Sequence, residues 1–334
     1  MNPLKPFVDL ATKPVETVQH ALNRPMSRPT PDGIVSFLRG PRDIRPAVRD
    51  KIVLITGASS GIGEAAALHI GAAGGTVILV ARTPEKLEAT ADGVRAEGGT
   101  AYVHPCDLSD LEGIDRLVAE VLEKHGRVDI LVNNAGRSIR RSLELSYDRF
   151  HDYERTMQLN YFAPVRLMLG LLPGMRERRF GQVINISSIG VQTRVPRFAA
   201  YIASKAALDT LSDAWQAETA DQGVRFTTIH MPLVRTPMIA PTKLYDRFPA
   251  LTPEQAGEVI AEAIVDRPRR ISPAFGRVAS FADSISPQLM DVVRNRGYKM
   301  FPDSKAAKGS KGPEDEPVSR TGQAFAEITR GVHW

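Results

Sequence analysis

Short apolar runs alternate with longer amphipathic segments through most of the chain. Between Lys51 and His230 the runs read KIVLI, TVILVA, TAYVHP, VDILV, VINIS and VRFTTIH. The segments that separate them repeat apolar residues at helical spacing over about 12 or more residues. Apolar strands joined by such helices form a parallel sheet that is covered on both faces. The pattern therefore predicts an α/β fold, a single doubly wound sheet over residues 50–272 with irregular extensions at both ends.

The two ends of the chain lack this regular pattern. Residues 1–49 carry eight of the 24 prolines, which predicts a Pro-rich N-terminal extension. An apolar stripe within it is expected to dock onto the domain or an oligomer partner, and contact with a membrane surface is the alternative. The stripe consists of Leu4, Phe7, Ala11, Val15, Val18 and Leu22. Residues 273–334 form a predicted C-terminal extension, in which the polar, Gly- and Pro-containing residues 303–320 are expected to be flexible.

A further irregular stretch follows the last apolar run. The sequence MPLVRTPMIAPTKLYDRFPALTPEQ, which begins at Met231, contains five prolines and only short apolar runs. In a doubly wound sheet this stretch leaves a strand at the carboxyl edge, where ligands of such sheets bind. Residues 231–252 are therefore predicted to form a lid over a substrate.

A glycine-rich loop, TGASSGIG, follows the first apolar run and opens a helix. Glycines at 57, 61 and 63 let the backbone approach a pyrophosphate, and the helix N-terminus supplies unpaired amides with about half a positive charge. The loop predicts that the sheet is of the Rossmann type and binds a dinucleotide. The residues expected to contact it here are Thr56, Gly57, Ser59, Ser60, Gly61, Ile62 and Gly63.

The end of the second apolar run indicates which dinucleotide is bound. A carboxylate there would bond the ribose 2′-hydroxyl of NAD, but no Asp or Glu lies between Gly75 and Pro84. Arg82 and Thr83 stand in its place and favour the 2′-phosphate of NADP(H), although a plain surface role for Arg82 is the alternative. Further cofactor contacts are expected after the third and fourth runs. These are Asp107 and Leu108, with Asp107 as a candidate partner of the adenine amino group, and Asn134, Ala135 and Gly136 near the ribose.

Three polar residues in the arrangement S-x12-Y-x3-K are the candidate catalytic group: Ser188, Tyr201 and Lys205. Residues four apart share one face of a helix, so the Lys205 ammonium is expected beside the Tyr201 phenol. A free Tyr has a pKa of ~10, and a neighbouring cation would lower it towards neutral pH. Ser188 ends a strand and is expected to hold a carbonyl oxygen. Y-x-x-x-K alone is common on solvated helix faces, but its position after a glycine-rich loop favours catalysis.

Composition narrows the classes of partner. The net charge of +5 and the pI of about 9.3 fit a nucleic acid, a membrane surface or an anionic substrate. No nucleic-acid motif is present, and the aromatic content is 6%. The single cysteine, Cys106, excludes an internal disulfide and is expected to be a packed residue rather than a nucleophile. Because no apolar run of about 18 residues or signal pattern is found, we expect a cytoplasmic protein without a transmembrane segment.

The motifs in this order resemble the short-chain dehydrogenase/reductase family over about residues 50–272. The resemblance implies that Asn160, in MQLNYF, is a fourth catalytic residue that supports a proton-relaying water near Lys205. It also implies that Tyr201 transfers the proton and that Lys205 holds the nicotinamide ribose. Val234 and Thr236 match positions that contact the nicotinamide, but Pro232 replaces the family's usual glycine. A homo-oligomer is expected on the same basis.

Longer strings resemble the bacterial long-chain fatty acyl-CoA reductases of this family. They are NNAGRSIRRS, YDRFHDYERTMQLNYF, NISSIG, MPLVRTPMIAPTKLY and the final HW. This resemblance implies that a small-molecule acyl-CoA is reduced to a fatty aldehyde with NADPH. Arg140, Arg141 and Arg194 are candidate partners of the CoA phosphates. The candidate lining of the acyl pocket, for which plain packing is the alternative, is Met231, Leu233, Met238, Ile239, Leu244, Tyr245 and Phe248.

Two other functions remain open at this point. A reductase or dehydrogenase of a ketone, aldehyde or hydroxyl substrate, such as a steroid, quinone or 3-oxoacyl compound, would need the same support for an oxyanion. A cofactor-binding scaffold without turnover is the alternative from a different class. The four filled catalytic positions argue against the scaffold.

Overall fold

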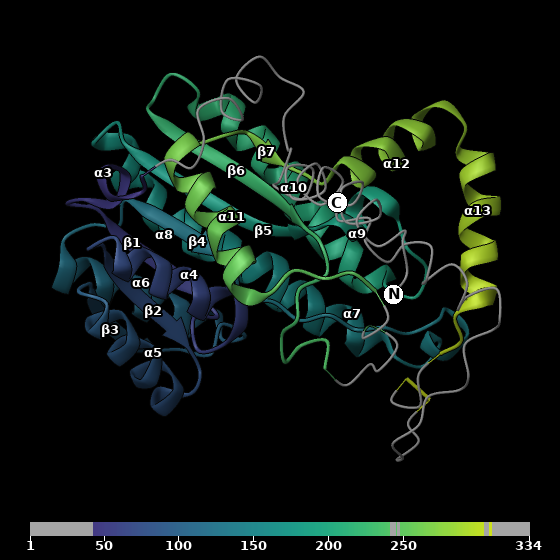
Figure 1. The fold of residues 1–334 in the computed structure, drawn as a ribbon, viewed down its shortest axis with the longest axis horizontal. Coiled ribbons are helices and arrows are strands. Elements are labelled where there is room, and N and C mark those ends of the chain that lie inside the picture. The colour runs from purple at the N-terminus through teal and green to yellow at the C-terminus, as the bar shows by residue number, and fades with distance from the viewer. Residues whose placement is uncertain (1–42, 241–244, 246–247, 304–306, 309–334) are drawn as a thin grey trace, which may run out of the picture.

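The computed structural model describes residues 43–240, 245, 248–303 and 307–308 (Figure 1). The predicted N-terminal stripe, Leu244 of the predicted lid and most of the predicted flexible tail lie outside these residues. In the described part of the chain, no helix is long and apolar enough to cross a membrane.

Seven strands form one parallel sheet among these residues, in the order β3-β2-β1-β4-β5-β6-β7. They are β1 (Ile52–Thr56), β2 (Thr76–Ala81), β3 (Thr100–Pro105), β4 (Ile130–Asn133), β5 (Gly181–Ser188), β6 (Val224–Met231) and β7 (Arg270–Ile271). The chain moves outward from β1 to β3 and then returns to the other side of β1. The loops after β1 and β4 therefore diverge, which opens a ligand-binding crevice at the carboxyl edge. The predicted fold class is confirmed.

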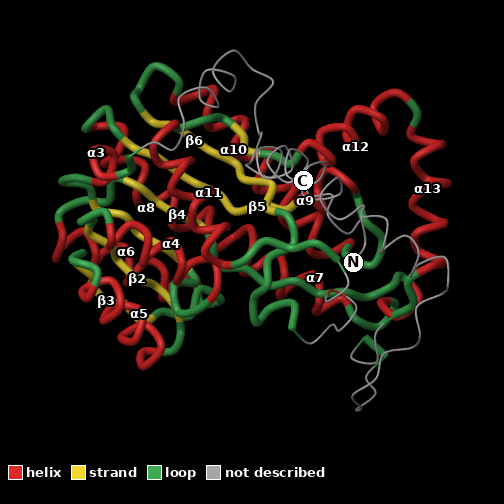
Figure 2. Tube along the Cα trace, viewed as in Figure 1, coloured by secondary structure: helices red, strands yellow, loops and turns green. Residues whose placement is uncertain are grey.

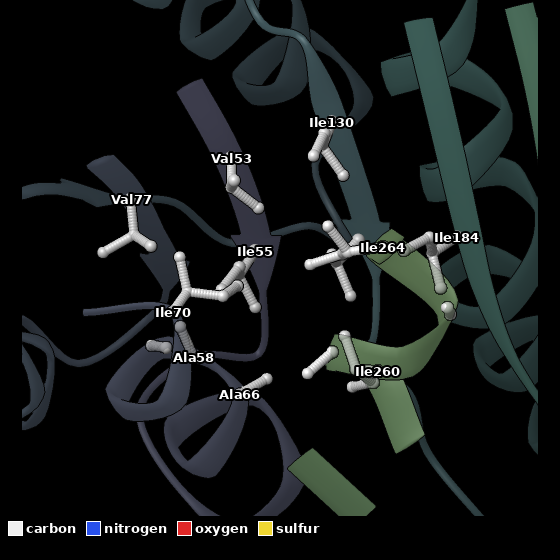
Figure 3. Packing of buried hydrophobic residues seen from close by; sticks show 14 of the residues in the cluster. Val53, Ile55, Ala58, Ala66, Ile70, Val77, Ile130, Ile184, Ile260 and Ile264 are labelled. Atoms are coloured by element: carbon white, nitrogen blue, oxygen red, sulfur yellow. The ribbon is translucent and has the colours of Figure 1, made fainter. Parts of the chain in front are cut away.

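The apolar strands are buried because helices cover both faces of the sheet (Figures 1 and 2). Val53 and Ile55 point to one face and Leu54 to the other, as the two-residue period of a strand requires. On the first face Val53 and Ile55 pack with Ile70 and Ile260, as Figure 3 shows. The helices of this face are α3 (Arg45–Val48), α4 (Gly61–Ala72), α5 (Pro84–Ala96) and α11 (Pro253–Asp266).

The opposite face is covered by α6 (Leu111–His125), α8 (Ala163–Glu177) and α10 (Ala199–Thr219). Phe226 of β6 lies in this second core and is among the largest fully buried side chains. The shorter helical elements near the site are η1 (Glu144–Ser146), α7 (Phe150–Met157), the π-helical turn η2 (Gln158–Phe162) and α9 (Ile189–Thr193). The sheet is therefore packed between two layers of helices.

The C-terminal extension is more regular than expected. Its first part forms α12 (Ala274–Ile285) and α13 (Pro287–Met300), which lie at one end of the molecule in Figure 1. The prediction that the C-terminal extension is irregular is therefore wrong for residues 274–300, which are largely helical. Gly276, Ala279 and Asp283 are the buried residues of α12, whereas large apolar side chains on the opposite face are exposed. An outward-facing apolar stripe is hard to recognise in sequence as part of a packed helix, because one expects apolar residues to face the core.

Substituting Phe226→Ala should lower the free energy of unfolding by about 3–5 kcal/mol, because it leaves a cavity in the second core. Phe281→Ala, on the exposed face of α12, should change it by less than about 0.5 kcal/mol. Urea unfolding followed by circular dichroism measures both values. Equal effects of the two substitutions would contradict the described core.

Candidate active site

The loop after β1 has the backbone shape of a phosphate cradle. Gly57 and Gly61 have φ of +65° and +60°, which favours glycine. A Cβ on Gly63 would lie 2.6 Å from Asn134 Nδ2 and closer still to the carbonyl oxygen of Gly57. Ser60, the N-cap of α4, makes no side-chain cap bond, so the first amides of this helix remain available to a ligand. These features fit the pyrophosphate of a dinucleotide.

Two expected cofactor residues brace this loop internally. Asn134 Nδ2 donates to the carbonyl of Thr56 at 2.9 Å, and the Thr56 hydroxyl accepts the amides of Asn134 and Ala135, each at 3.0 Å. Thr56 is buried. The contacts tie the ends of β1 and β4 together at the point where the strand order reverses. Thr56 and Asn134 therefore stabilise the shape of the cradle through hydrogen bonds between the two loops.

The candidates for the adenosine end lie at the carboxyl ends of β2 and β3, which pair in register through Ala81 and Pro105. Arg82 and Thr83 are exposed, and no partner of Arg82 is found among the described residues. Asp107 is exposed and accepts the amide of Ser109 at 2.9 Å. Leu108, in contrast, is buried in the second core. Arg82 is thus free to meet an anion from the solvent side.

Ser188 and Tyr201 meet where β5 ends. Ser188 is the last residue of β5 and the N-cap of α9, and its Oγ accepts the amide of Gly190 at 3.0 Å. Tyr201 lies in the first turn of α10, and its phenol lies near enough to the Ser188 hydroxyl for that hydroxyl to influence its pKa. The two hydroxyls that the sequence predicts to support a carbonyl oxygen are therefore adjacent.

The protonation of Tyr201 differs from the sequence prediction. Burial raises the pKa of its phenol above the ordinary value, and the hydrogen bond from Ser188 only partly opposes this. The expected lowering of this pKa by Lys205 is wrong, because the Lys205 ammonium is directed elsewhere. It donates to the carbonyl of Ile186 in β5 at 2.8 Å. Tyr201 is consequently a neutral phenol at neutral pH, which suits a proton donor.

Lys205 is almost completely buried, with 4% of its surface exposed. Burial lowers its pKa from 10.5 to about 8, and the carboxylate of Asp209 partly opposes that shift. The side chain therefore still carries a proton at neutral pH. It lies close to Gly136, since a Cβ on that glycine would be 3.4 Å from its Nζ.

Asn160 is completely buried in η2, the π-helical turn between α7 and α8. Its Oδ1 accepts the amide of Arg137 at 2.8 Å, and its Nδ2 donates to the Ser204 hydroxyl at 3.0 Å. The side chain thus joins the loop after β4 to the catalytic helix. A Cβ on Gly136 would lie 3.3 Å from Asn160 Oδ1, so Asn160 and Lys205 flank the same glycine. Single π-helical turns of this kind often occur at functional sites.

The start of the predicted lid also reaches the cradle. A Cβ on Gly61 would lie 3.0 Å from Thr236 Cγ2. Val234 is buried and forms a bridge with Leu251, where Arg235 N donates to the Leu251 carbonyl at 2.9 Å. The segment after β6 therefore runs along the glycine loop despite the proline at 232.

Comparison with known proteins identifies the family to which this site belongs. A model described as short chain dehydrogenase matches residues 51–245. The chain belongs to the short-chain dehydrogenase/reductase family. It is an oxidoreductase of this family. The matched range includes the glycine loop and Ser188, Tyr201 and Lys205, whose roles stay predictions.

Individual relatives extend this likeness. An uncharacterized oxidoreductase of Mycobacterium bovis is 57% identical over 98% of this chain and 98% of its own. A fatty acyl-CoA reductase of Acinetobacter baylyi is 51% identical over 87% of this chain and 97% of its own. A metagenomic short-chain oxidoreductase solved in complex with NADP is 32% identical, with a TM-score of 0.59, over 68% of this chain and 96% of its own.

Two of the arginines that were candidates for CoA phosphates are engaged within this short-chain dehydrogenase. Arg141 pairs with the buried Asp152 at 3.0 Å and also donates to the Ala307 carbonyl. Arg194 pairs with the buried Asp283 of α12. Both guanidinium groups thus neutralise buried carboxylates, and their assignment to the CoA phosphates stays a prediction. Sequence could not show this, since Asp283 lies far away along the chain.

The candidate acyl-pocket residues also separate into groups. Met231 is buried in the first core and belongs to the packing of the sheet. Phe248 packs against Phe301, with ring centroids 5.6 Å apart. Tyr245 lies near Tyr201 and Arg140, which affect its pKa, and burial raises that pKa to about 12. Tyr245 is thereby linked to the phenol of Tyr201.

Sequence inspection missed a buried polar group behind the catalytic helix. Asp209 accepts a hydrogen bond from the Ser187 hydroxyl, and its carboxylate also contacts His230 Nε2. Ser187 and His230 are register partners on β5 and β6. The signal was present in the sequence, because Asp209 follows Tyr201 and Lys205 at helical spacing on the same face.

Gly63→Ala should weaken dinucleotide binding at least about tenfold, because the added Cβ collides with the Gly57 carbonyl that shapes the cradle. Gly297→Ala is the matched control, since nothing lies within 4 Å of a Cβ there. Fluorescence titration with NADPH and NADH measures the dissociation constants. Unchanged binding by the Gly63 variant would contradict the assignment of the cradle.

Proposed function

We propose that this protein reduces a long-chain fatty acyl-CoA to the fatty aldehyde with NADPH. The main support is the 51% identity to the fatty acyl-CoA reductase of Acinetobacter baylyi. That match spans 290 residues and is much longer than the stretch matched by the general family model. It must therefore include segments outside the shared catalytic core, where substrate preference is expected to reside.

The paired hydroxyls of Ser188 and Tyr201 support the chemistry of a thioester carbonyl. As the carbonyl carbon becomes tetrahedral, negative charge develops on its oxygen, and these hydroxyls are placed to donate to it. Tyr201 then gives its proton to that oxygen. Its raised pKa keeps the proton available at neutral pH.

The reduced nicotinamide supplies, when bound, a hydride to the carbonyl carbon. The glycine loop and the N-terminus of α4 would hold its pyrophosphate, and Lys205 would hold its ribose. In the resulting hemithioacetal, the C–S bond breaks, the C=O bond re-forms, and the hydroxyl proton passes to the leaving sulfur. The products are the aldehyde and the CoA thiol.

A covalent enzyme thioester is not part of this route. Cys106 is the single cysteine of the chain, and it follows β3 rather than β5. Burial raises the pKa of its thiol, which disfavours the nucleophilic thiolate. Direct attack on the acyl-CoA therefore fits the residues present.

The preference for NADPH rests on the exposed guanidinium of Arg82 at the end of β2. A 2′-phosphate bound there would form charge-assisted hydrogen bonds with Arg82, and the segment offers no carboxylate for a 2′-hydroxyl. The NADP-bound relative has the same family fold, which is consistent with this choice.

The alternative is reduction of a free ketone or aldehyde, or oxidation of the corresponding hydroxyl. It uses the same two hydroxyls, so the geometry around Tyr201 is equally suited to it. The two functions differ in one product, because only a thioester releases a thiol.

A homo-oligomer and peripheral membrane contact stay predictions. Both α12 and α13 present exposed apolar side chains that such contacts would cover. They are Phe275, Val278, Phe281, Ile285, Leu289, Val292 and Val293.

Purified protein should oxidise NADPH in the presence of palmitoyl-CoA and release one thiol for each NADPH consumed. Tyr201→Phe should reduce this rate about 10²- to 10⁴-fold while NADPH binding persists, because the proton donor is lost. Tyr102→Phe, on β3, is the matched control and should retain the rate. Consumption of ketones or aldehydes without thiol release would overturn the acyl-CoA proposal.

Arg82→Asp should raise the Michaelis constant for NADPH by about 10- to 100-fold, because an attractive charge is replaced by a repulsive one. The constant for NADH should change much less. Arg116→Asp, an exposed change on α6, controls for the altered net charge. Equal changes for the two nucleotides would refute the role of Arg82.

A further inference from the structure

A buried carboxylate lies one helical turn beyond the catalytic lysine. Tyr201, Lys205 and Asp209 follow each other at intervals of four residues along α10, so they share one face of this helix. Lys205 and Asp209 are both buried, with 4% and 8% of their surfaces exposed. The ammonium therefore has a buried carboxylate one helical turn away, and the charge of that carboxylate acts on it without a direct ion pair between the two described side chains.

Two strands fix the position of this carboxylate. Asp209 Oδ2 accepts the Ser187 hydroxyl at 2.9 Å and lies 3.0 Å from His230 Nε2. Ser187 and His230 are register partners in β5 and β6, which places both side chains on the face that α10 covers. His230 Nδ1 in turn lies 2.7 Å from the Ser272 hydroxyl, which orients the ring.

The other carboxylate oxygen, Oδ1, is buried and has no hydrogen-bond partner among the described residues. A buried carboxylate with an unpaired oxygen is costly unless it serves a nearby charge. In the described part of the chain, no hydrogen bond of Oδ1 offsets the cost of burying it. The negative charge of the carboxylate is therefore the property that we connect to a role.

We propose that Asp209, fixed by Ser187 and His230, is a positioning residue that keeps the catalytic Lys205 charged and its ammonium bound to the Ile186 carbonyl. This inference rests on the proposed role of Tyr201 and Lys205 in reduction. The inference does not depend on which substrate is reduced, because Lys205 would have the same role with a thioester and with a ketone or aldehyde.

The physical argument is an opposition between burial and charge. Burial alone favours a neutral lysine, and the Asp209 carboxylate favours the ammonium. At about 8, the resulting pKa of Lys205 lies only slightly above neutral pH. Without the carboxylate, the lysine would lose its proton near neutrality, and a neutral amine would bind the Ile186 carbonyl more weakly.

Other titratable groups around Asp209 are the phenol of Tyr201, the imidazole of His230 and the guanidinium of Arg269. Burial raises the pKa of Tyr201, and Asp209 adds to that shift; burial lowers the pKa of Arg269, and Asp209 partly opposes that shift. Asp213, one turn further along α10, pairs with Arg269 and Arg270 near the surface. Removing the negative charge of Asp209 should therefore lower the pKa values of Lys205 and Tyr201 together.

The direct test is the titration of Lys205 in the nucleotide-free protein. Carbon-13 NMR of lysine-labelled protein, with Lys205→Arg to assign the signal, should show a pKa near 8 for wild type. Asp209→Asn should lower it by about one pH unit or more. Asp213→Asn, a matched loss of a half-buried carboxylate one turn further along the same helix, should shift it by less than about 0.3 unit. An unshifted signal in the Asp209 variant would overturn the inference.

The pH profile of NADPH-dependent reduction gives a second readout. Reduction needs a protonated donor, so the rate falls as pH rises. In Asp209→Asn the pH at which this fall occurs should be about one unit lower than in wild type. Asp209→Glu, which keeps the charge, should restore it. A rate reduced equally at every pH would indicate a merely structural residue and refute the proposal.

Two controls separate the possible failures. If wild type shows no reductase activity, the proposed function fails, while the NMR titration still decides the role of Asp209. If Asp209→Asn does not fold, the double substitution Asp209→Asn with His230→Gln replaces the pair by two amides and carries the same expected shift.

Discussion

The hydrogen bond from the Lys205 ammonium to the Ile186 carbonyl joins the catalytic helix to the central strand, and the geometry of the site depends on it. It crosses from α10 to β5 in a buried region, two residues before Ser188. One turn earlier on the same helix, Tyr201 meets the Ser188 hydroxyl. Because strand and helix are linked in this way, both hydroxyls are fixed at the carboxyl edge. A charged lysine is needed for the strongest form of this bond.

The switch in strand order supplies the second requirement, a place for the nucleotide beside those hydroxyls. Thr56 and Asn134 tie the diverging ends of β1 and β4 together, and Gly136, which follows β4, lies close to Lys205. Thr236 closes the same loop from the side of β6. The cradle and the candidate catalytic group therefore lie along one edge of the sheet. The C-terminal helix α12 is attached to this edge through Arg194 and Asp283.

Much of this arrangement could be predicted from sequence because it depends on local signals. Alternating apolar runs predict the sheet, TGASSGIG predicts the cradle, and the spacing of Tyr201 and Lys205 predicts a shared helix face. The rest depends on contacts between distant segments. The partners of Arg141 and Arg194 and the pairing of Ser187 with His230 follow from tertiary packing and strand register. The pKa of Tyr201 also required the structure, since burial outweighs the nearby charges.

Transfer of deuterium from the nucleotide to the substrate carbon tests the central claim most directly. Palmitoyl-CoA would be incubated with the protein and NADPH doubly deuterated at C4 of the nicotinamide. The aldehyde would be trapped, and its mass would be measured by mass spectrometry. If the edge formed by Ser188, Tyr201 and Lys205 reduces the thioester directly, the aldehyde carbon carries one deuterium. An aldehyde without deuterium, or palmitoyl-CoA recovered unchanged while NADPH is bound, would contradict the account.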